Sequence, residues 1–161
     1  MKNFKKGFTL IELLVVVAII GILAAVVVAA LNGANSKGKD AAVKSNLKSA
    51  ITQGEVLFNT RTANLNSYTN ACTNGPVDGA RGVGELVLTA AKATGLAAYG
   101  TNAIGTATTA TCNNSANAWA AEVPLKTTTP AANQMWCVDS TGKSVQTTGS
   151  TLATAADVAC N

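Results

Sequence analysis

Few residues of this chain are equipped to do chemistry. Glu12 is a single carboxylate within a long apolar run near the N-terminus, and four cysteines lie further along: Cys72, Cys112, Cys137 and Cys160. The 161 residues include no histidine, which removes histidine general bases, Ser/His and Cys/His nucleophile pairs, and histidine metal sites. The composition therefore argues against an enzyme, and we expect no metal or other cofactor.

The four cysteines are better explained as disulfides than as a metal or redox site. None of them has the Cys-x-x-Cys spacing that a zinc site or a thioredoxin-like site uses. Disulfides presuppose an oxidising compartment outside the cytoplasm. Of the three possible connectivities we prefer Cys72 with Cys112 and Cys137 with Cys160, because the second pair would tie the C-terminal tail to a hairpin; four buried free thiols are the alternative.

The N-terminal third contains a basic head followed by a segment long enough to cross a membrane. Lys2, Lys5 and Lys6 lie within residues 1–7, and the only clearly polar side chains in residues 8–31 are Thr9 and Glu12. A 24-residue helix is about 36 Å long, against about 30 Å for the hydrocarbon layer. A cleaved secretory signal has a shorter apolar stretch, so release of a secreted enzyme after Ala30 is the weaker interpretation.

Charge patterning describes an anchored protein rather than a nucleic-acid binder. The formal net charge is +4, but removal of the head lysines would leave nine basic residues against eight acidic ones. Nucleic acid is therefore an unlikely direct ligand. Lysines lie on both flanks of the apolar run, so the positive-inside rule does not decide the orientation of the chain in the membrane. The cysteines decide it, since disulfides place the C-terminal domain outside and the basic head in the cytoplasm.

Residues 32–59 continue the helical pattern in an amphipathic form. An apolar stripe recurs at helical spacing, and the opposite face is expected to carry polar residues that include Asp40 and Lys44 as a favourable i,i+4 pair. No proline separates this segment from residues 8–31. One long helix is therefore predicted. The residues of the stripe are Val43, Leu47, Ala50, Ile51, Gly54, Leu57 and Phe58.

Residues 60–161 are expected to form a globular head in two parts. The first, 60–115, is a variable region with few periodicities and one short helix at 83–93 that Gly95 terminates. The second, 116–161, contains an alternating strand at 119–125, a hairpin whose arms are 134–139 and 143–147, and a C-terminal tail. The predicted fold class is α+β, with a long N-terminal helix packed on a small antiparallel sheet.

Glu12 is the most informative polar residue, because an ionised carboxylate in an apolar helix is costly without a positive partner. A positive group one helical turn away, at the position of Phe8, would be such a partner, either in the same chain or in a neighbouring subunit. The simpler alternative is that Glu12 only complements the positive end of the helix dipole.

The run Lys5-Lys6-Gly7-Phe8-Thr9-Leu10-Ile11-Glu12, followed by an uninterrupted apolar helix, resembles the class III signal of type IV pilins and their relatives. The resemblance implies cleavage between Gly7 and Phe8 by the prepilin peptidase, N-methylation of Phe8, and a role for Glu12 in setting axial register. It also implies a pilin-like head. One departure is that no proline stands near Ala29, where many type IVa pilins have one.

The resemblance implies a structural subunit of a type IV pilus-like surface filament. Residues 1–7 would be the leader, and the precursor would cross the inner membrane once with its N-terminus in the cytoplasm. The protein would then form an extracellular homo-oligomeric filament with the help of the pilus assembly machinery. Small residues would allow its apolar helices to approach one another closely: Gly21, Ala24 and Ala25.

Two further roles remain open at this point. A pseudopilin of a type II secretion system shares the N-terminal motif and differs in the length and use of its filament. A single-span surface adhesin would keep the same anchor and never polymerise.

Lysines 37, 44 and 48 lie near one helical face, and we interpret them as a solvated stripe.

Overall fold

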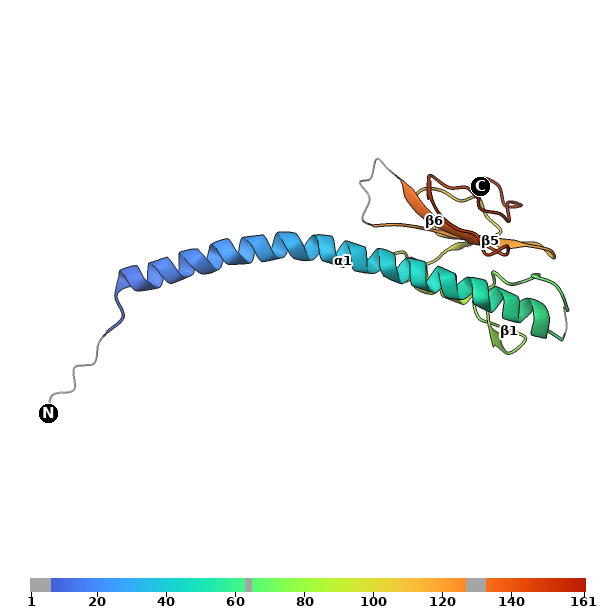
Figure 1. Ribbon diagram of the computed structural model, residues 1–161, viewed down its shortest axis with the longest axis horizontal. Coiled ribbons are helices and arrows are strands. Elements are labelled where there is room, and N and C mark those ends of the chain that lie inside the picture. The colour runs from blue at the N-terminus through green and yellow to red at the C-terminus, as the bar shows by residue number, and fades with distance from the viewer. Residues whose placement is uncertain (1–6, 63–64, 127–132) are drawn as a thin grey trace. The chain divides into compact units, whose positions relative to one another are not determined.

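The computed structural model describes residues 7–62, 65–126 and 133–161, and it shows an α+β fold (Figure 1). Two compact units divide the chain, one ending at Asn35 and the other formed by Ser36–Asn161. Helix α1 begins in the first unit and ends in the second. The elements are α1 (Leu10–Thr60), β1 (Pro76–Val77), β2 (Ala80–Arg81), α2 (Val83–Ala93), β3 (Gly100–Thr101), β4 (Thr111–Asn114), β5 (Trp119–Pro124), β6 (Gln134–Asp139) and β7 (Ser144–Thr148).

The second half of α1 supplies one wall of the core of the second unit. Five positions at helical spacing are buried, as the apolar pattern predicts: Val43, Leu47, Ala50, Gly54 and Leu57. Asp40 is also buried, so the prediction that it lies on the solvent face was wrong. Its Oδ1 accepts a hydrogen bond of 2.6 Å from the backbone N–H of Lys126, which supplies the partner that a buried carboxylate needs.

The main sheet has five strands in the order β3-β4-β5-β6-β7. Strands β4 to β7 form an antiparallel meander, and Glu122 of β5 pairs with Cys137 of β6. Strand β3 runs parallel to β4, so the sheet is mixed at this edge rather than wholly antiparallel. Strands β5 to β7 and helix α2 occupy the predicted positions, whereas β1 to β4 lie in the region that the sequence presents as irregular.

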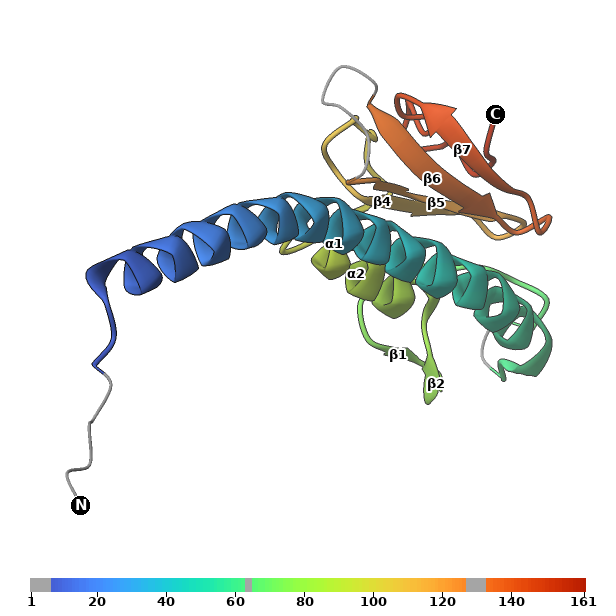
Figure 2. The ribbon, with the colours of Figure 1, turned by 60° about the vertical axis from the view of Figure 1, so that its left-hand side comes forward.

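One face of the sheet packs on the helices. Figure 2 shows α2 alongside the second half of α1, and buried side chains of both helices join a single hydrophobic cluster with β4, β5 and β6. Trp119 of β5 is fully buried and lies so close to Gly54 that a Cβ added there would stand 2.6 Å from the indole nitrogen. Glycine at this position therefore lets α1 approach the sheet.

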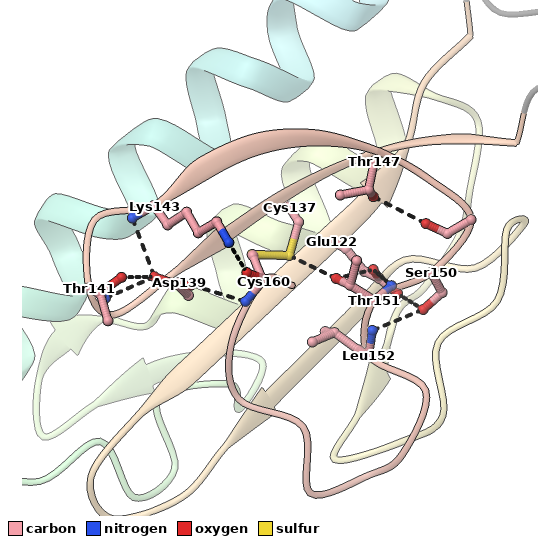
Figure 3. The surroundings of a disulfide bond; sticks show 11 residues. Glu122, Cys137, Asp139, Thr141, Lys143, Thr147, Ser150, Thr151, Leu152 and Cys160 are labelled. Atoms are coloured by element: carbon pink, nitrogen blue, oxygen red, sulfur yellow. Dashed lines mark hydrogen bonds between the residues drawn. A yellow bond between two sulfur atoms is a disulfide. The ribbon is translucent and has the colours of Figure 1, made fainter.

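The opposite face of the sheet is covered by the C-terminal segment (Figure 3). The fully buried Glu122 accepts hydrogen bonds from the Ser150 hydroxyl and from the Thr151 N–H at 3.0 Å. Cys137 and Cys160 are joined in a disulfide. The hydrogen bonds to Glu122 and the disulfide thus hold the C-terminal segment against the sheet.

Asp139 makes the third connection to the tail. Its Oδ2 accepts the Cys160 N–H at 3.0 Å, and its Oδ1 accepts the hydroxyl of Thr141 at 2.6 Å. Burial raises the pKa of Asp139, but these hydrogen bonds, with those from the N–H groups of Thr141 and Lys143, outweigh it and lower the pKa below its usual value. The ionised form is therefore the one that the fold favours.

We predict that Asp139 makes the protein sensitive to acid. Because its folded pKa is lowered, its contribution is complete above the unfolded pKa of about 3.9 and is lost as the pH falls through the folded value. The free energy of unfolding, measured by urea denaturation between pH 6 and pH 2, should fall more steeply for the wild type than for Asp139→Asn. Parallel curves for the two proteins would contradict this role.

The second disulfide joins Cys72 to Cys112 of β4, across 40 residues. Both disulfides match the pairing preferred in the sequence analysis. The Cys72 carbonyl also accepts a hydrogen bond of 2.6 Å from the Tyr99 hydroxyl. This bridge closes the region between α1 and the meander, which contains little regular structure of its own, and such a loop closure stabilises a fold mainly by restricting the unfolded chain.

Candidate processing and assembly site

Gly7 and Phe8 lie just before α1, in a segment that has no regular secondary structure and is open to solvent. Phe8 is 80% exposed, and nothing lies within 4 Å of the position that a Cβ on Gly7 would occupy. A protease needs an uncovered, non-helical backbone at the bond that it cuts, and this segment provides one. The head lysines Lys2, Lys5 and Lys6 lie outside the described residues.

Thr9 and Glu12 form a capping box at the start of α1. The Glu12 carboxylate accepts the Thr9 N–H at 2.9 Å and the Thr9 hydroxyl at 2.8 Å, and the Glu12 N–H donates to the Thr9 hydroxyl at 3.2 Å. Two backbone N–H groups that no helical carbonyl can reach are thereby satisfied. Glu12 thus has a structural role within its own chain, beside the intersubunit role that the sequence analysis assigned to it.

The sequence analysis missed the part played by Thr9. The signal was present, because Thr-x-x-Glu directly before an apolar run is the pattern of a capping box. The charge of Glu12 predicts an ionic partner, whereas its role in the cap depends on hydrogen bonds with Thr9.

The apolar side chains of residues 8–31 are left uncovered by the rest of the described chain. The large hydrophobic residues there are between 47% and 80% exposed, from Val16 to Phe8. Burying one such side chain is worth about 1.5–3 kcal/mol, so this surface needs lipid or other protein to cover it. Within the described ranges, α1 is the helix whose length and composition suffice to span a membrane.

Gly21, Ala24 and Ala25 are all exposed, and nothing lies within 4 Å of a Cβ built on Gly21. Residues spaced i, i+3 and i+4 share one face of a helix, so these three form a narrow surface without bulky side chains. Their role in helix packing stays a prediction, since a single chain contains no neighbouring helix.

Residues 2–28 match the family described as the prokaryotic N-terminal methylation motif, which covers the cleavage segment, the capping box and most of the apolar run. The similarity to this family lies in the N-terminal segment of the chain.

One curated protein is similar to part of the chain. Over 70 residues, which are 44% of this chain and 50% of the relative, the chain is 45% identical to the type IV wide pilus major component PilA4 of Thermus thermophilus. The chain thus spans about half the length of the curated relative that it matches. No solved structure matched it.

We predict that substitutions at Glu12 separate its two roles. Glutamine can keep a capping box but removes the charge, so Glu12→Gln and Glu12→Ala should both lower filament yield about tenfold, the effect of losing an interaction of 1.4 kcal/mol. Membrane insertion should be unchanged because the apolar run is intact. Thr9→Val, which weakens the cap by about 1 kcal/mol, should reduce yield far less.

The measurement compares the amount of pilin in sheared surface filaments with the amount in the membrane fraction. Normal yield from Glu12→Gln together with low yield from Glu12→Ala would show that only the cap matters.

Proposed function

We propose that this protein is the structural subunit of a type IV pilus-like surface filament and not an enzyme. Leader residues 1–7 are removed, residues 8–31 form the helical core of the filament, residues 32–59 connect this core to the head, and residues 60–161 form the exposed head. The observation that carries the proposal is the uninterrupted, uncovered apolar half of α1, which starts directly after Gly7-Phe8 and contains Glu12 as its one carboxylate.

The physical basis of assembly is an exchange of surroundings. In the membrane, lipid covers residues 8–31; in a filament, the same residues of other copies do so. Such a transfer gains little from the hydrophobic effect alone, because lipid is as apolar as a neighbouring helix. The free energy that favours the filament comes instead from close packing at Gly21 and Ala25 and from the pairing of Glu12 with the amino group of a neighbour's Phe8.

In the proposed orientation the head lies outside the cytoplasm and the leader lies on the cytoplasmic side of the inner membrane. The disulfides Cys72–Cys112 and Cys137–Cys160 support it, because disulfides persist in an oxidising compartment. There the prepilin peptidase cuts after Gly7, Phe8 is N-methylated, and the assembly machinery receives the mature subunit.

A pseudopilin of a type II secretion system is the closest alternative, because it would use the same N-terminal segment. The similarity to the major component of a pilus favours the surface filament. A single-span adhesin accounts for the anchor but gives Glu12 no partner in a second copy. Electron microscopy of the surface of wild-type and deletion strains separates these functions.

We predict that the mature chain begins at Phe8 and carries an N-methylated amine. Gly7→Leu should block cleavage because the added side chain prevents close approach of the protease to the backbone, and the precursor should accumulate in the membrane. Intact-mass analysis of membrane and filament fractions measures both results. A mature chain that starts at Leu31 would instead support the secreted protein.

We also predict that bulky residues on the small-residue face block assembly. Gly21→Leu and Ala25→Leu should reduce filament yield several-fold, because they hold neighbouring helices apart, while insertion is unchanged or improved. Val26→Leu is a matched control, since it keeps a large apolar side chain in the same part of the helix. Filament and membrane fractions would be quantified side by side, and wild-type yield from both test variants would remove close helix packing from the account.

A further inference from the structure

One flank of the second half of α1 carries a row of charges with opposite signs at its two ends. At 100° per residue, Lys37, Lys44, Lys48, Ile51 and Glu55 fall within a sector of about 60°, beside the buried stripe. The basic residues lie toward the N-terminus and Glu55 lies toward the C-terminus. Glu55 is exposed, whereas the other carboxylate in this half of the helix, Asp40, is buried.

The basic end of this row borders a groove between α1 and the β6–β7 hairpin. The groove has a volume of about 480 Å³ and is lined by Lys44, Ser45, Lys48, Ile51, Trp136, Gly142 and Ser144. The ammonium of Lys44 lies 4.5 Å from the centroid of the Trp136 ring, a cation–π contact that holds the charge at the groove. The lining contains two positive charges and no carboxylate.

The acidic end is also held in place. The Tyr68 hydroxyl donates a hydrogen bond of 3.0 Å to Oε1 of Glu55. Burial of Tyr68, together with this hydrogen bond and the nearby Glu55 charge, raises the pKa of Tyr68 to about 12, so the tyrosine stays a donor at neutral pH. One oxygen of Glu55 is thereby fixed, and the exposed carboxylate retains capacity for another partner.

Neither Lys44 nor Lys48 forms an ion pair with a carboxylate among the described residues. Like charges at i,i+4 on a helix repel each other at a small cost, and a carboxylate placed between them would convert this repulsion into attraction. In two parallel copies that face each other across this flank, Glu55 of one copy is available as such a carboxylate.

We propose that the Lys44/Lys48 groove receives Glu55 of a second copy, so that neighbouring heads are connected by a charged contact. The contact rests on the proposed filament function. It differs from the pairing of Glu12 with Phe8, because it joins heads rather than apolar segments.

The contact sets a geometric condition. Glu55 follows Lys48 by seven residues and Lys44 by eleven, which at 1.5 Å per residue are axial offsets of about 10 Å and 17 Å. Two parallel copies displaced along α1 by a distance in this interval bring Glu55 of one beside the lysines of the other.

The test is a charge exchange in the full chain. Lys48→Glu and Glu55→Lys should each raise the concentration needed for assembly about fivefold, since each replaces an attraction with a repulsion of the size measured for exposed pairs. The double variant Lys48→Glu/Glu55→Lys should restore assembly to within about twofold of the wild type. Lys39→Glu, on the opposite flank of α1, makes the same charge change and should assemble normally.

Filament yield, membrane-fraction pilin and the thermal unfolding midpoint would be measured for all five proteins. Rescue of assembly by the double variant, whose thermal midpoint should equal that of Glu55→Lys because both lose the hydrogen bond from Tyr68, supports the contact. Wild-type yield from both single variants, or a double variant as poor as the worse single one, overturns it and leaves the filament function standing. Absence of filaments from the wild type would instead refute the proposed function.

Discussion

The structure depends on one energetically unfavourable feature, an apolar surface that is exposed to solvent. Residues 8–31 present a continuous apolar surface that the rest of the described chain does not cover, and the single carboxylate within it lies at the first turn of α1. Every feature of the N-terminal unit fits this constraint. The side chains of Thr9 and Glu12 satisfy backbone N–H groups at the start of α1, and the small residues near the middle of the run allow another helix to come close.

The second unit, in contrast, has a core that is thin and contains few large apolar side chains. Its sheet is held from both faces, by α1 and α2 on one side and by the C-terminal segment on the other (Figure 3). The second contact depends on polar groups, because Glu122 and Asp139 bind the tail through its backbone and hydroxyl groups, and the disulfide makes this attachment covalent. Disulfides of this kind persist in an oxidising compartment.

The sequence predicted the elements whose signals are local. Helix α2 has a periodic apolar face and a glycine stop, and the hairpin of β6 and β7 has an Asp-x-x-Gly turn that the structure reproduces, with the Gly142 N–H donating to the Asp139 carbonyl. Strand β4 was missed because Thr-Cys-Asn-Asn lacks an alternating pattern and is a strand only through its pairing with β5. The burial of Asp40 depends on a backbone donor 86 residues away, which no local pattern reveals. At the candidate site, the motif predicted Gly7 and Phe8 as the cleavage residues and Glu12 as an assembly residue. The charged flank that ends at Glu55 could not be predicted in the same way, because its contacts with Trp136 and Tyr68 depend on the tertiary fold.

The central claim is that the apolar half of α1 is buried against copies of itself in a surface filament. Cryo-electron microscopy of filaments sheared from wild-type cells tests it directly, because the map locates each residue relative to its neighbours. The account predicts a core made of residues 8–31 from many copies, with each Glu12 beside the amino group of Phe8 in an adjacent subunit. A filament whose core excludes these residues, or a protein that stays in the membrane as a monomer while filaments of another protein form, would contradict it.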